Sequence, residues 1–412
     1  MLPHHLKFTV HHGERVHLGV TGSIAAYKSL ELLRILGELE LIVSVTLTEA
    51  ATRFITPLSF ESLGASHVYS GMWNGSDSAF GHLEPSQEAR CMVIAPATAN
   101  TIAKLAHGLA DELLSTQALA FAGPMLVAPA MNPRLWDAKP TQHNLAMLRD
   151  RGVTVIEPEC GQMACGETGK GRMPNPHDIA AQVLKAMTNP DMAGSRVLVS
   201  LGPTREFFDP ARYWSNPSTG LMGAALAMAA WLRGADVTVV HGPVDIWLPG
   251  SIRRIAVRTA QEMFDACTGI WSRQDYGIMT AAVSDFSPVP YGNEKFKKRS
   301  MESDEIMIPF RTNPDILRTL GANKAEGQRL MGFCAETSDL ARYASMKLKE
   351  KNCDMMVANS IAVTGPDASS GFAAKTNQVL VVDSVGRSEQ WPTLTKTEVA
   401  WRLLEWMTQL LP

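Results

Sequence analysis

The sequence of 412 residues has no apolar run long enough to cross a membrane. Its longest apolar stretches, 118–131 and 221–232, are short or interrupted and stay below the roughly 20 residues that a membrane-spanning helix needs. A basic excess is also missing, because 38 Lys and Arg residues face 41 Asp and Glu residues, for a formal net charge of -3. A nucleic-acid partner would call for a basic stripe. We therefore expect a soluble protein that binds neither a membrane nor nucleic acid.

Cysteine is scarce as well, with 6 residues spread thinly along the chain. Such spacing is typical of a reducing compartment rather than of a disulfide scaffold. The first residues carry histidines where a secretory signal would have a cationic patch and an apolar core. These features predict a cytoplasmic location.

The first 188 residues alternate between short, continuously apolar runs and helical patterns. Continuous apolar character is typical of parallel strands that are covered on both faces. The succession predicts a doubly wound parallel sheet. We expect strands at 15–20, 41–47, 91–95, 124–128 and 153–156, and helices at 23–36, 99–106, 111–120 and 142–151.

Residues 189–195 are rich in turn formers and small residues, and they form the predicted linker. The same alternation then resumes, so the sequence predicts an α/β fold of two doubly wound, Rossmann-like domains in series, at 1–188 and 196–412. We expect strands at 196–201, 236–240, 277–281, 330–334, 354–358 and 378–383, and helices at 221–233, 260–267, 314–321, 339–352 and 395–411.

Three segments of the first half place small or hydrogen-bonding residues at predicted strand ends. In 19–23 (GVTGS), Gly22 and Ser23 stand where backbone N–H groups and a hydroxyl can meet a phosphate, although an ordinary strand–helix turn is the alternative. The segments 95–101 (APATANT) and 128–132 (APAMN) end two further strands. Open α/β sheets bind ligands at such carboxyl ends.

A glycine-rich segment, 160–174, follows the last predicted strand of this half. So many glycines exclude a stable helix and predict a mobile flap that carries Cys165 and Arg172. Cys160 and Cys165 have no second Cys/His pair nearby, which argues against a zinc site. A cysteine is usually an inert core residue, but a loop offers Cys165 no core to enter.

Six segments in this order resemble the flavin-dependent cysteine decarboxylase family, specifically phosphopantothenoylcysteine decarboxylases: GVTGSIAAYK, TEAATRFITP, GHLE, PATANT, PAMN and ACGETGKGRM. The resemblance implies that FMN lies across the strand ends and oxidises the cysteine side chain of the substrate, so that decarboxylation leaves an enethiolate that is then reduced and protonated. It implies that His82 is the active-site histidine and that Asn132 binds the substrate carboxylate. It also implies that Cys165 donates the final proton and that Arg172 binds the substrate. The cofactor-binding residues implied are Gly22, Ser23, Thr48, Pro96, Thr98 and Asn100.

One departure from the family pattern concerns the segment after His82. The family continues with a helix, whereas Pro85 stands here and is expected to interrupt it. A lone histidine is more often a surface or core residue, so the assignment of His82 depends on its place in the family motif.

The second half carries a loop, 202–220, that is rich in Ser, Thr, Asn and Gly and precedes a predicted helix. Such a loop can cradle phosphate, and Arg205 and Arg212 add anion-binding groups. The basic run at 295–299 (KFKKR) is either a solvated loop or a triphosphate contact.

The segments GPTRE, SNPSTGLMG, AAVSDF, NPDI and GFCAET resemble phosphopantothenate–cysteine ligases. The resemblance implies that CTP activates the carboxylate of 4′-phosphopantothenate as an acyl-cytidylate, which the amine of cysteine attacks, with Mg2+ bridging the nucleotide phosphates. It implies that Lys295 supports formation of the acyl-cytidylate, that Asn216 acts on it and that Arg212 holds the substrate phosphate. It places Asp285, Phe333, Lys347 and Lys351 in the nucleotide site, although an exposed helical pair is the alternative for the two lysines.

The two resemblances together imply a bifunctional enzyme of coenzyme A biosynthesis that forms a homo-oligomer, expected to be a dodecamer. Where the ligase family has His and a basic residue, this sequence has Pro217 and Leu221. The alternatives are therefore an active flavodomain with a degenerate ligase half, or a flavin-binding regulatory protein.

Overall fold

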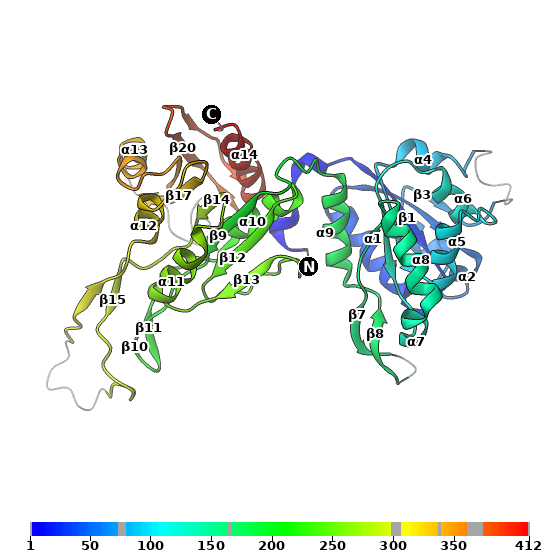
Figure 1. Ribbon diagram of the computed structural model, residues 1–412, viewed down its shortest axis with the longest axis horizontal. Coiled ribbons are helices and arrows are strands. Elements are labelled where there is room, and N and C mark those ends of the chain that lie inside the picture. Colours follow the sequence, from blue (N-terminus) through cyan, green and yellow to red (C-terminus); the bar gives the residue numbers. More distant parts are fainter. Residues whose placement is uncertain are drawn as a thin grey trace. The chain divides into compact units, whose positions relative to one another are not determined.

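The computed structural model describes residues 2–72, 80–163, 166–297, 306–336, 339–360 and 374–410. It divides into two compact units (Figure 1). Unit 1 comprises residues 1–2 and 8–188, and unit 2 comprises residues 3–7 and 189–412.

Unit 1 is built on a six-stranded, entirely parallel sheet of order β3-β2-β1-β4-β5-β6. Strand β4 is buried throughout and β1 is buried after Arg15, because their side chains, apart from Arg15 and His17, are apolar on both faces. This order is the doubly wound arrangement expected from the sequence, and the fold class is confirmed. The strands are β1 (Arg15–Val20), β2 (Ile42–Leu47), β3 (His67–Tyr69), β4 (Cys91–Ala97), β5 (Met125–Pro129) and β6 (Thr154–Val155).

Helices cover both faces of this sheet. Apart from 3-10 turns at Thr9–His11 (η2) and Ile24–Tyr27 (η3), they are α1 (Lys28–Glu38), α2 (Glu49–Thr52), α3 (Pro57–Ser62), α4 (Glu84–Glu88), α5 (Ala99–His107), α6 (Leu113–Ala120), α7 (Pro133–Asp137), α8 (Lys139–Asp150) and α9 (Pro176–Met187). The sequence did not predict β3, since its three residues form no apolar run.

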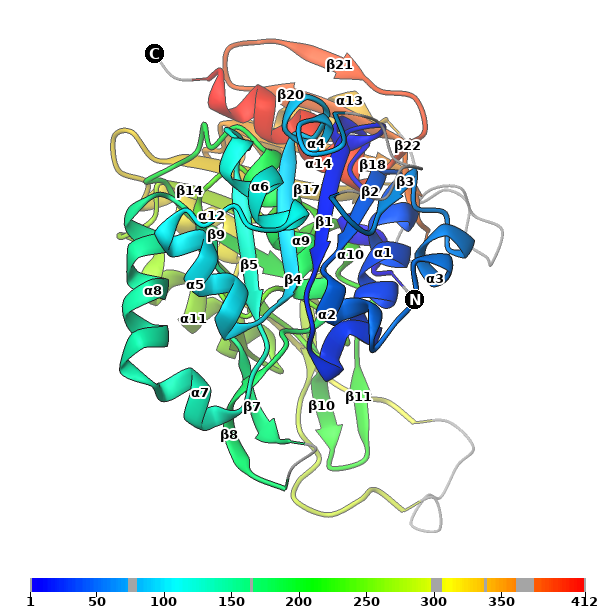
Figure 2. The ribbon, with the colours of Figure 1, turned by 90° about the vertical axis from the view of Figure 1, so that its right-hand side faces the viewer.

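The glycine-rich segment of unit 1 forms an antiparallel hairpin of β7 (Glu159–Gln162) and β8 (Thr168–Arg172). Cys165 lies outside the described residues. In Figure 2 this hairpin and α7 stand at the lower end of the sheet, below the carboxyl ends of β4 and β5, while α4 stands at the upper end. The absence of a helix here agrees with the sequence prediction.

Unit 2 contains an eight-stranded sheet of order β13-β12-β9-β14-β17-β18-β20-β21. Strands up to β18 are parallel, whereas β20 and β21 join antiparallel. The strands are β9 (Arg196–Leu201), β12 (Asp236–His241), β13 (Arg253–Ala256), β14 (Tyr276–Met279), β17 (Arg329–Glu336), β18 (Met355–Ser360), β20 (Val379–Asp383) and β21 (Ser388–Gln390). The second predicted α/β domain is therefore confirmed as a fold.

The helices of unit 2 are α10 (Leu221–Leu232), α11 (Ala260–Trp271), α12 (Ile316–Ala322), α13 (Leu340–Glu350) and α14 (Lys396–Thr408). Helix α10 is apolar all round, and a helix of that kind has to be covered on every side. It packs on β9 and β12, and it is also covered by α14 and by the 3-10 turn η1 (His4–Leu6).

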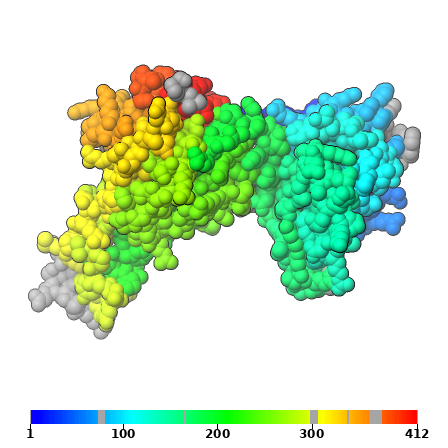
Figure 3. Space-filling model, in the orientation of Figure 1, coloured from blue at the N-terminus to red at the C-terminus, as the bar shows by residue number. Residues whose placement is uncertain are grey.

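Unit 2 also carries three small ribbons: β10 (Glu206–Asp209) with β11 (Arg212–Trp214), β15 (Phe286–Pro288) with β16 (Phe310–Thr312), and β19 (Thr376–Asn377) with β22 (Leu394–Thr395). The first two pack side by side and form an arm that projects from the sheet, shown in green and yellow at the lower left of Figure 3. The sequence predicted a loop here, because exposed strands have no apolar run to reveal them.

Candidate active sites

The candidate site of unit 1 begins where β1 and β4 end side by side. The hydroxyl of Thr21 donates to the Pro96 carbonyl over 2.7 Å and accepts from the Thr98 backbone N–H over 3.1 Å. Thr21 is buried, so these bonds are shielded from water. They bring the predicted GVTGS and PATANT segments together at one edge of the sheet.

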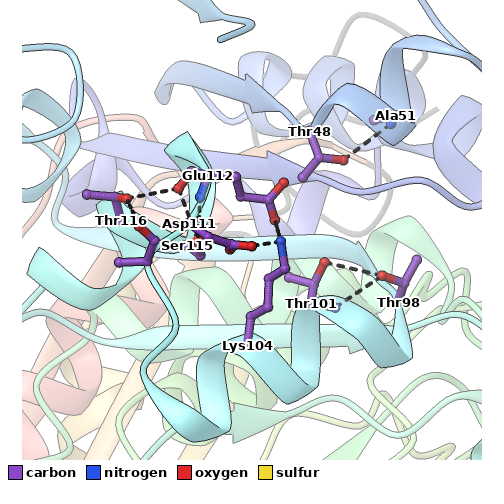
Figure 4. A network of polar contacts seen from close by, with 10 residues as sticks. Thr48, Ala51, Thr98, Thr101, Lys104, Asp111, Glu112, Ser115 and Thr116 are labelled. Carbon is purple, nitrogen blue, oxygen red and sulfur yellow. Dashed lines mark hydrogen bonds and ion pairs between the residues drawn. The ribbon is translucent and has the colours of Figure 1, made fainter. Parts of the chain in front are cut away.

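Three hydroxyl side chains cap the helical turns that leave this edge. Ser23 accepts from Ala25, Thr48 from the Ala51 N–H, and Thr98 from the Thr101 N–H. Figure 4 shows the Thr48 and Thr98 caps. A capping hydroxyl uses its oxygen as an acceptor, so Ser23 and Thr48 keep a hydrogen for a ligand.

The residues at this edge fit a phosphate-bearing flavin. A Cβ at Gly22 would lie 2.5 Å from the Ala50 Cβ, so only glycine lets the backbone of this turn pass so close to its neighbour. Asn100 is exposed at the start of α5, and Pro96 is buried at the end of β4. None of the six predicted cofactor-binding residues is acidic, which suits an anion.

A polar network joins α5, which begins at this edge, to the start of α6 (Figure 4). Lys104 of α5 forms ion pairs with Asp111 at 2.9 Å and Glu112 at 3.2 Å. Glu112 also forms a capping box with Ser115 at the start of α6. Burial alone would lower the pKa of Lys104, but its hydrogen bonds with the two carboxylates outweigh this and raise the pKa.

Helix α6 in turn anchors the segment that carries His82. Gln117 is fully buried; its amide N–H donates to the Gly81 carbonyl over 2.8 Å, and its carbonyl oxygen accepts from the Thr46 hydroxyl over 2.7 Å. On the other side of His82, the Tyr69 hydroxyl donates to Glu84 over 2.7 Å. The half-buried His82 is thus held between two fixed neighbours.

The prediction that Pro85 interrupts a helix after His82 is wrong. A helix, α4, does form after His82, because Pro85 stands in its first turn, where a missing N–H costs nothing. The helix spans only Glu84–Glu88.

Asn132 follows β5 and caps α7. Its Oδ1 accepts from the Arg134 backbone N–H over 2.8 Å, and its Nδ2 donates to the Glu167 carboxylate of the hairpin over 2.7 Å. The hairpin is fixed at its base, where the Met131 N–H donates to the Gly171 carbonyl over 2.9 Å. A Cβ at Gly171 would collide with the Met131 carbonyl. The predicted PAMN segment and flap are therefore in direct contact.

Arg172 ends the hairpin, and its guanidinium packs on Gly161 of the facing strand. Glu157 pairs with Lys170 of the hairpin and with Arg149 of α8, each at 2.6 Å, and so links the hairpin to that helix. Burial alone would raise the pKa of Glu157, but the hydrogen bonds and charges of these two cations outweigh it and lower the pKa.

The structure shows no direct bond between His82 and Asn132 within the described part of one chain. Helix α4, which directly follows His82, and helix α7, which Asn132 caps, lie at opposite ends of unit 1 in both ribbon views (Figures 1 and 2). In the described part of the chain, no hydrogen bond or ion pair links the two residues.

The candidate site of unit 2 forms where β9 and β14 end. The Asn216 amide N–H group donates to the carbonyls of Ala282 and Val283, over 3.3 and 3.2 Å. The Thr204 hydroxyl accepts from the Ser284 N–H over 3.2 Å. These bonds join the predicted phosphate-binding loop to the AAVSDF segment that contains Asp285.

Asp209 links Arg212 of the arm to the loop that contains Lys295 and Phe296. Its buried carboxylate pairs with Arg212 at 2.8 Å and accepts from the Phe296 N–H over 3.1 Å. Arg212 also donates to the Phe296 carbonyl over 3.1 Å. Because Lys295 directly precedes Phe296 and is exposed, the structure places it on the same loop that contacts Arg212.

The two lysines predicted for the nucleotide site, Lys347 and Lys351, lie on α13 and at its carboxyl end. Lys347 pairs with Glu336 at 2.6 Å, and Lys351 pairs with Asp315 at 3.1 Å. Burial would lower the pKa of Lys347, but Glu336 outweighs it and raises the pKa, with a smaller contribution from Asp285. Phe333 is half-buried on β17. Each lysine is therefore held by a carboxylate from another element.

The fit to Mg2+ differs from the fit to a flavin. Across the ranges that the structure describes, no group of three or more His, Cys, Asp or Glu side chains could hold a metal ion. In the same ranges, no helix combines the length and apolar character needed to cross a membrane.

Sequence reasoning missed Gln117, Glu167, Thr204 and Asp209. Gln117 could have been suspected because it is a polar residue in a largely apolar helix. Glu167 could have been suspected because it lies inside the flap motif. Thr204 bonds to Ser284, 80 residues away, and Asp209 bonds to Phe296, 87 residues away, and no local pattern reveals either contact.

Two family models match the chain. The model described as Flavoprotein matches residues 8–188, and that of the DNA/pantothenate metabolism flavoprotein C-terminal domain matches residues 192–411. The coenzyme A biosynthesis bifunctional protein CoaBC of Bacillus subtilis (strain 168) is 38% identical over 395 residues, which cover 95% of this chain and 95% of the relative. CoaBC of Escherichia coli (strain K12) is 41% identical over 353 residues, covering 85% and 87%.

Among solved structures, the C-terminal domain of a CoaBC protein is similar at 35% identity and a TM-score of 0.44, covering 54% of this chain and 98% of that one. The family models together extend over both units, and the relatives match both in series. The resemblance found in the sequence is confirmed: the chain belongs to the family of coenzyme A biosynthesis bifunctional flavoproteins, which join a decarboxylase and a phosphopantothenate–cysteine ligase.

Proposed function

We propose that residues 1–188 bind FMN and decarboxylate 4′-phosphopantothenoylcysteine, that residues 189–195 are the linker, and that residues 196–412 make this substrate from 4′-phosphopantothenate, cysteine and CTP. The observation that carries the proposal for the first half is the joined ends of β1 and β4, where Thr21 binds both Pro96 and Thr98. Gly22, Ser23, Thr48, Pro96, Thr98 and Asn100 would hold the cofactor there. When bound, FMN supplies the oxidation and later reduction of the substrate's sulfur-bearing carbon.

Asn132 is proposed to hold the substrate carboxylate. Its Oδ1 is occupied as the cap of α7, so the amide presents its N–H side to the site. A carboxylate only accepts hydrogen bonds, which matches this orientation. Cys165 of the flap would supply the final proton, and Arg172 would bind the substrate.

A homo-oligomer, expected as a dodecamer, is proposed because helix α4, which follows His82, and helix α7, which Asn132 caps, lie at opposite ends of unit 1 (Figure 2). A second copy would then bring its His82 to the site of the first. Exposed apolar side chains on unit 1, among them Ile24, Tyr27, Phe54 and Leu58, offer surface for such an assembly.

In unit 2, Lys295 and Arg212 are proposed to offset the negative charge that gathers as CTP and 4′-phosphopantothenate react. Asn216 would act on the acyl-cytidylate, and Asp285, Phe333, Lys347 and Lys351 would bind the nucleotide. The described residues form no resident metal site, so Mg2+ is proposed to arrive on the CTP phosphates as part of the substrate. The cytoplasm is the proposed location, in keeping with the scarce cysteines.

The test is incubation of the full chain with 4′-phosphopantothenate, cysteine, CTP and Mg2+, with pyrophosphate and CO2 both measured. Mass spectrometry of the released cofactor should find FMN rather than FAD. Pro217 and Leu221 keep a second function open, a decarboxylase with a degenerate ligase half. That alternative predicts CO2 from added 4′-phosphopantothenoylcysteine but no pyrophosphate from CTP.

A further inference from the structure

The contact between Asn132 and Glu167 has a chemical meaning beyond fixing the flap. The Asn132 Nδ2 donates to Glu167 Oε2 over 2.7 Å, and Glu167 Oε1 pairs with Arg134 at 2.6 Å. The amide that the proposed function assigns to the substrate carboxylate therefore already holds a carboxylate, which belongs to the protein itself.

The geometry leaves Asn132 little freedom to serve both groups in another way. Its Oδ1 is fixed by the Arg134 N–H at 2.8 Å, so the amide cannot rotate without losing the cap of α7. The Nδ2 has a second hydrogen, but a second carboxylate on it would lie beside the Glu167 carboxylate, and a single exposed cation, Arg134, would face both negative charges. Exchange is therefore favoured over sharing.

Glu167 can leave this position while the hairpin stays anchored. The base of the hairpin is held by the Met131–Gly171 backbone bond and by the Glu157–Lys170 ion pair, neither of which involves Glu167. Arg134 is 84% exposed, so it can follow the Glu167 carboxylate outward. Glu167 itself is one-third exposed, so its carboxylate already borders the solvent into which it would move.

We propose that Glu167 is a specificity-determining residue that occupies the carboxylate-binding amide of Asn132 until a substrate carboxylate replaces it. The inference rests on the proposed function of Asn132. Ligands that bring a carboxylate of their own regain the bond that Glu167 gives up. A ligand without one leaves Glu167 in place, and Asn132 then contributes nothing to its binding.

The test compares two inert ligands by isothermal titration calorimetry on the full, flavin-loaded chain. One is 4′-phosphopantothenoylserine, in which a hydroxyl replaces the reactive thiol. The other is its counterpart lacking the carboxylate, 4′-phosphopantothenoylethanolamine. Removal of the internal competitor in Glu167→Ala should tighten the serine ligand about 10-fold, the size of one charge-assisted hydrogen bond, and leave the ethanolamine ligand within about 2-fold.

Two further variants control for folding and flap stability. Glu167→Gln keeps the shape and a neutral acceptor, so it should tighten the serine ligand by a smaller factor, about 3-fold, and it carries the test if Glu167→Ala fails to fold. Glu157→Gln breaks the flap's other ion pairs without touching Asn132, and it should change neither affinity. Equal tightening of both ligands in the Glu167 variants, or no tightening of the serine ligand, overturns the proposal.

Asn132→Asp separates this proposal from the proposed function. It keeps the Oδ1 cap of α7 but replaces the N–H donor with an acceptor, so the serine ligand should weaken while the ethanolamine ligand does not. If this weakening occurs but Glu167→Ala has no effect, only the exchange is wrong. If Asn132→Asp changes neither affinity, the proposed role of Asn132 fails together with the exchange.

Discussion

Gln117 binds the carbonyl of Gly81, 36 residues away, over 2.8 Å, and so fixes the backbone directly before His82. The side chain is fully buried, and its other end is held by Thr46 of β2. The backbone next to His82 is therefore held by a hydrogen-bonded link to the central sheet, and not only by the loop that carries His82.

The Gln117→Leu substitution should lower the decarboxylation rate on the order of 10-fold, because the segment with His82 loses its fixed neighbour. It should also cost about 1–3 kcal/mol of unfolding free energy for each buried group left unpaired. Thr46→Val is the matched control, since it removes the bond to β2 but keeps the bond to Gly81. A rate loss of the same size in both variants would mean that stability, and not His82, accounts for the effect.

Mixing of two inactive variants tests whether one site needs two copies. His82→Asn and Asn132→Ala should each abolish decarboxylation, whereas chains mixed and reassembled should regain a fraction of the activity, because some sites then receive an intact residue from each copy. CO2 release after mild denaturation and refolding of the mixture is the measurement. Complete failure to recover, with oligomers of normal size by native mass spectrometry, would place both residues in one chain's site.

The ligase half offers a separation of two steps. Lys295→Gln should abolish pyrophosphate release, since losing one cationic contact to a transferring phosphoryl group costs about 3 kcal/mol or more, roughly 100-fold in rate. Asn216→Asp should instead let the acyl-cytidylate accumulate when cysteine is omitted. Chromatography of the mixed anhydride distinguishes them, and accumulation in the Lys295 variant would reverse the assignment.

Acid should destabilise unit 1 through His17. This side chain is fully buried, contacts Ser44 at 2.8 Å, and has no partner for its Nε2 within the described residues. Burial lowers the pKa of His17 from 6.5 to about 3. The unfolded chain takes up a proton below about pH 6.5 while the folded chain stays neutral, so stability falls as the pH falls, by about 2 kcal/mol between pH 7 and 5.

The matched variant for this pH effect is His17→Asn, which can still bind Ser44 but does not titrate. Denaturant unfolding at pH 5 and 7 should show a smaller difference for the variant than for the unaltered chain. An identical pH dependence would assign the effect to other groups, such as His11, whose pKa burial lowers to about 4.

Much of the fold was predictable because a parallel strand that is buried on both faces has a nearly continuous run of apolar residues in the sequence. Strand β1 was predicted with the bounds Arg15–Val20 that it has, and β9 with Arg196–Leu201. The short strand β3 and the exposed ribbon of β10 and β11 were missed, since their stability comes from pairing with neighbours rather than from a local pattern.

The candidate sites show the same division. The strand-end segments of unit 1 were predicted to gather because parallel strands share one edge, and Thr21 does join them. The bond from Gln117 to the Gly81 carbonyl, beside His82, was not foreseeable, because it links residues 36 positions apart. The bond between Asn132 and Glu167 was equally hidden, since it links residues 35 positions apart.

Residues 3–7 stand near the start of the chain but belong to unit 2. His5 binds the Trp247 carbonyl over 2.6 Å, and the Thr397 hydroxyl donates to the Lys7 carbonyl over 2.5 Å, so a piece from the start of the chain covers α10 in the second unit. A cut between 188 and 189 would therefore not yield two self-sufficient halves. A ligase fragment prepared alone would expose part of its most apolar helix, and supplying the first residues as a separate peptide should restore its solubility.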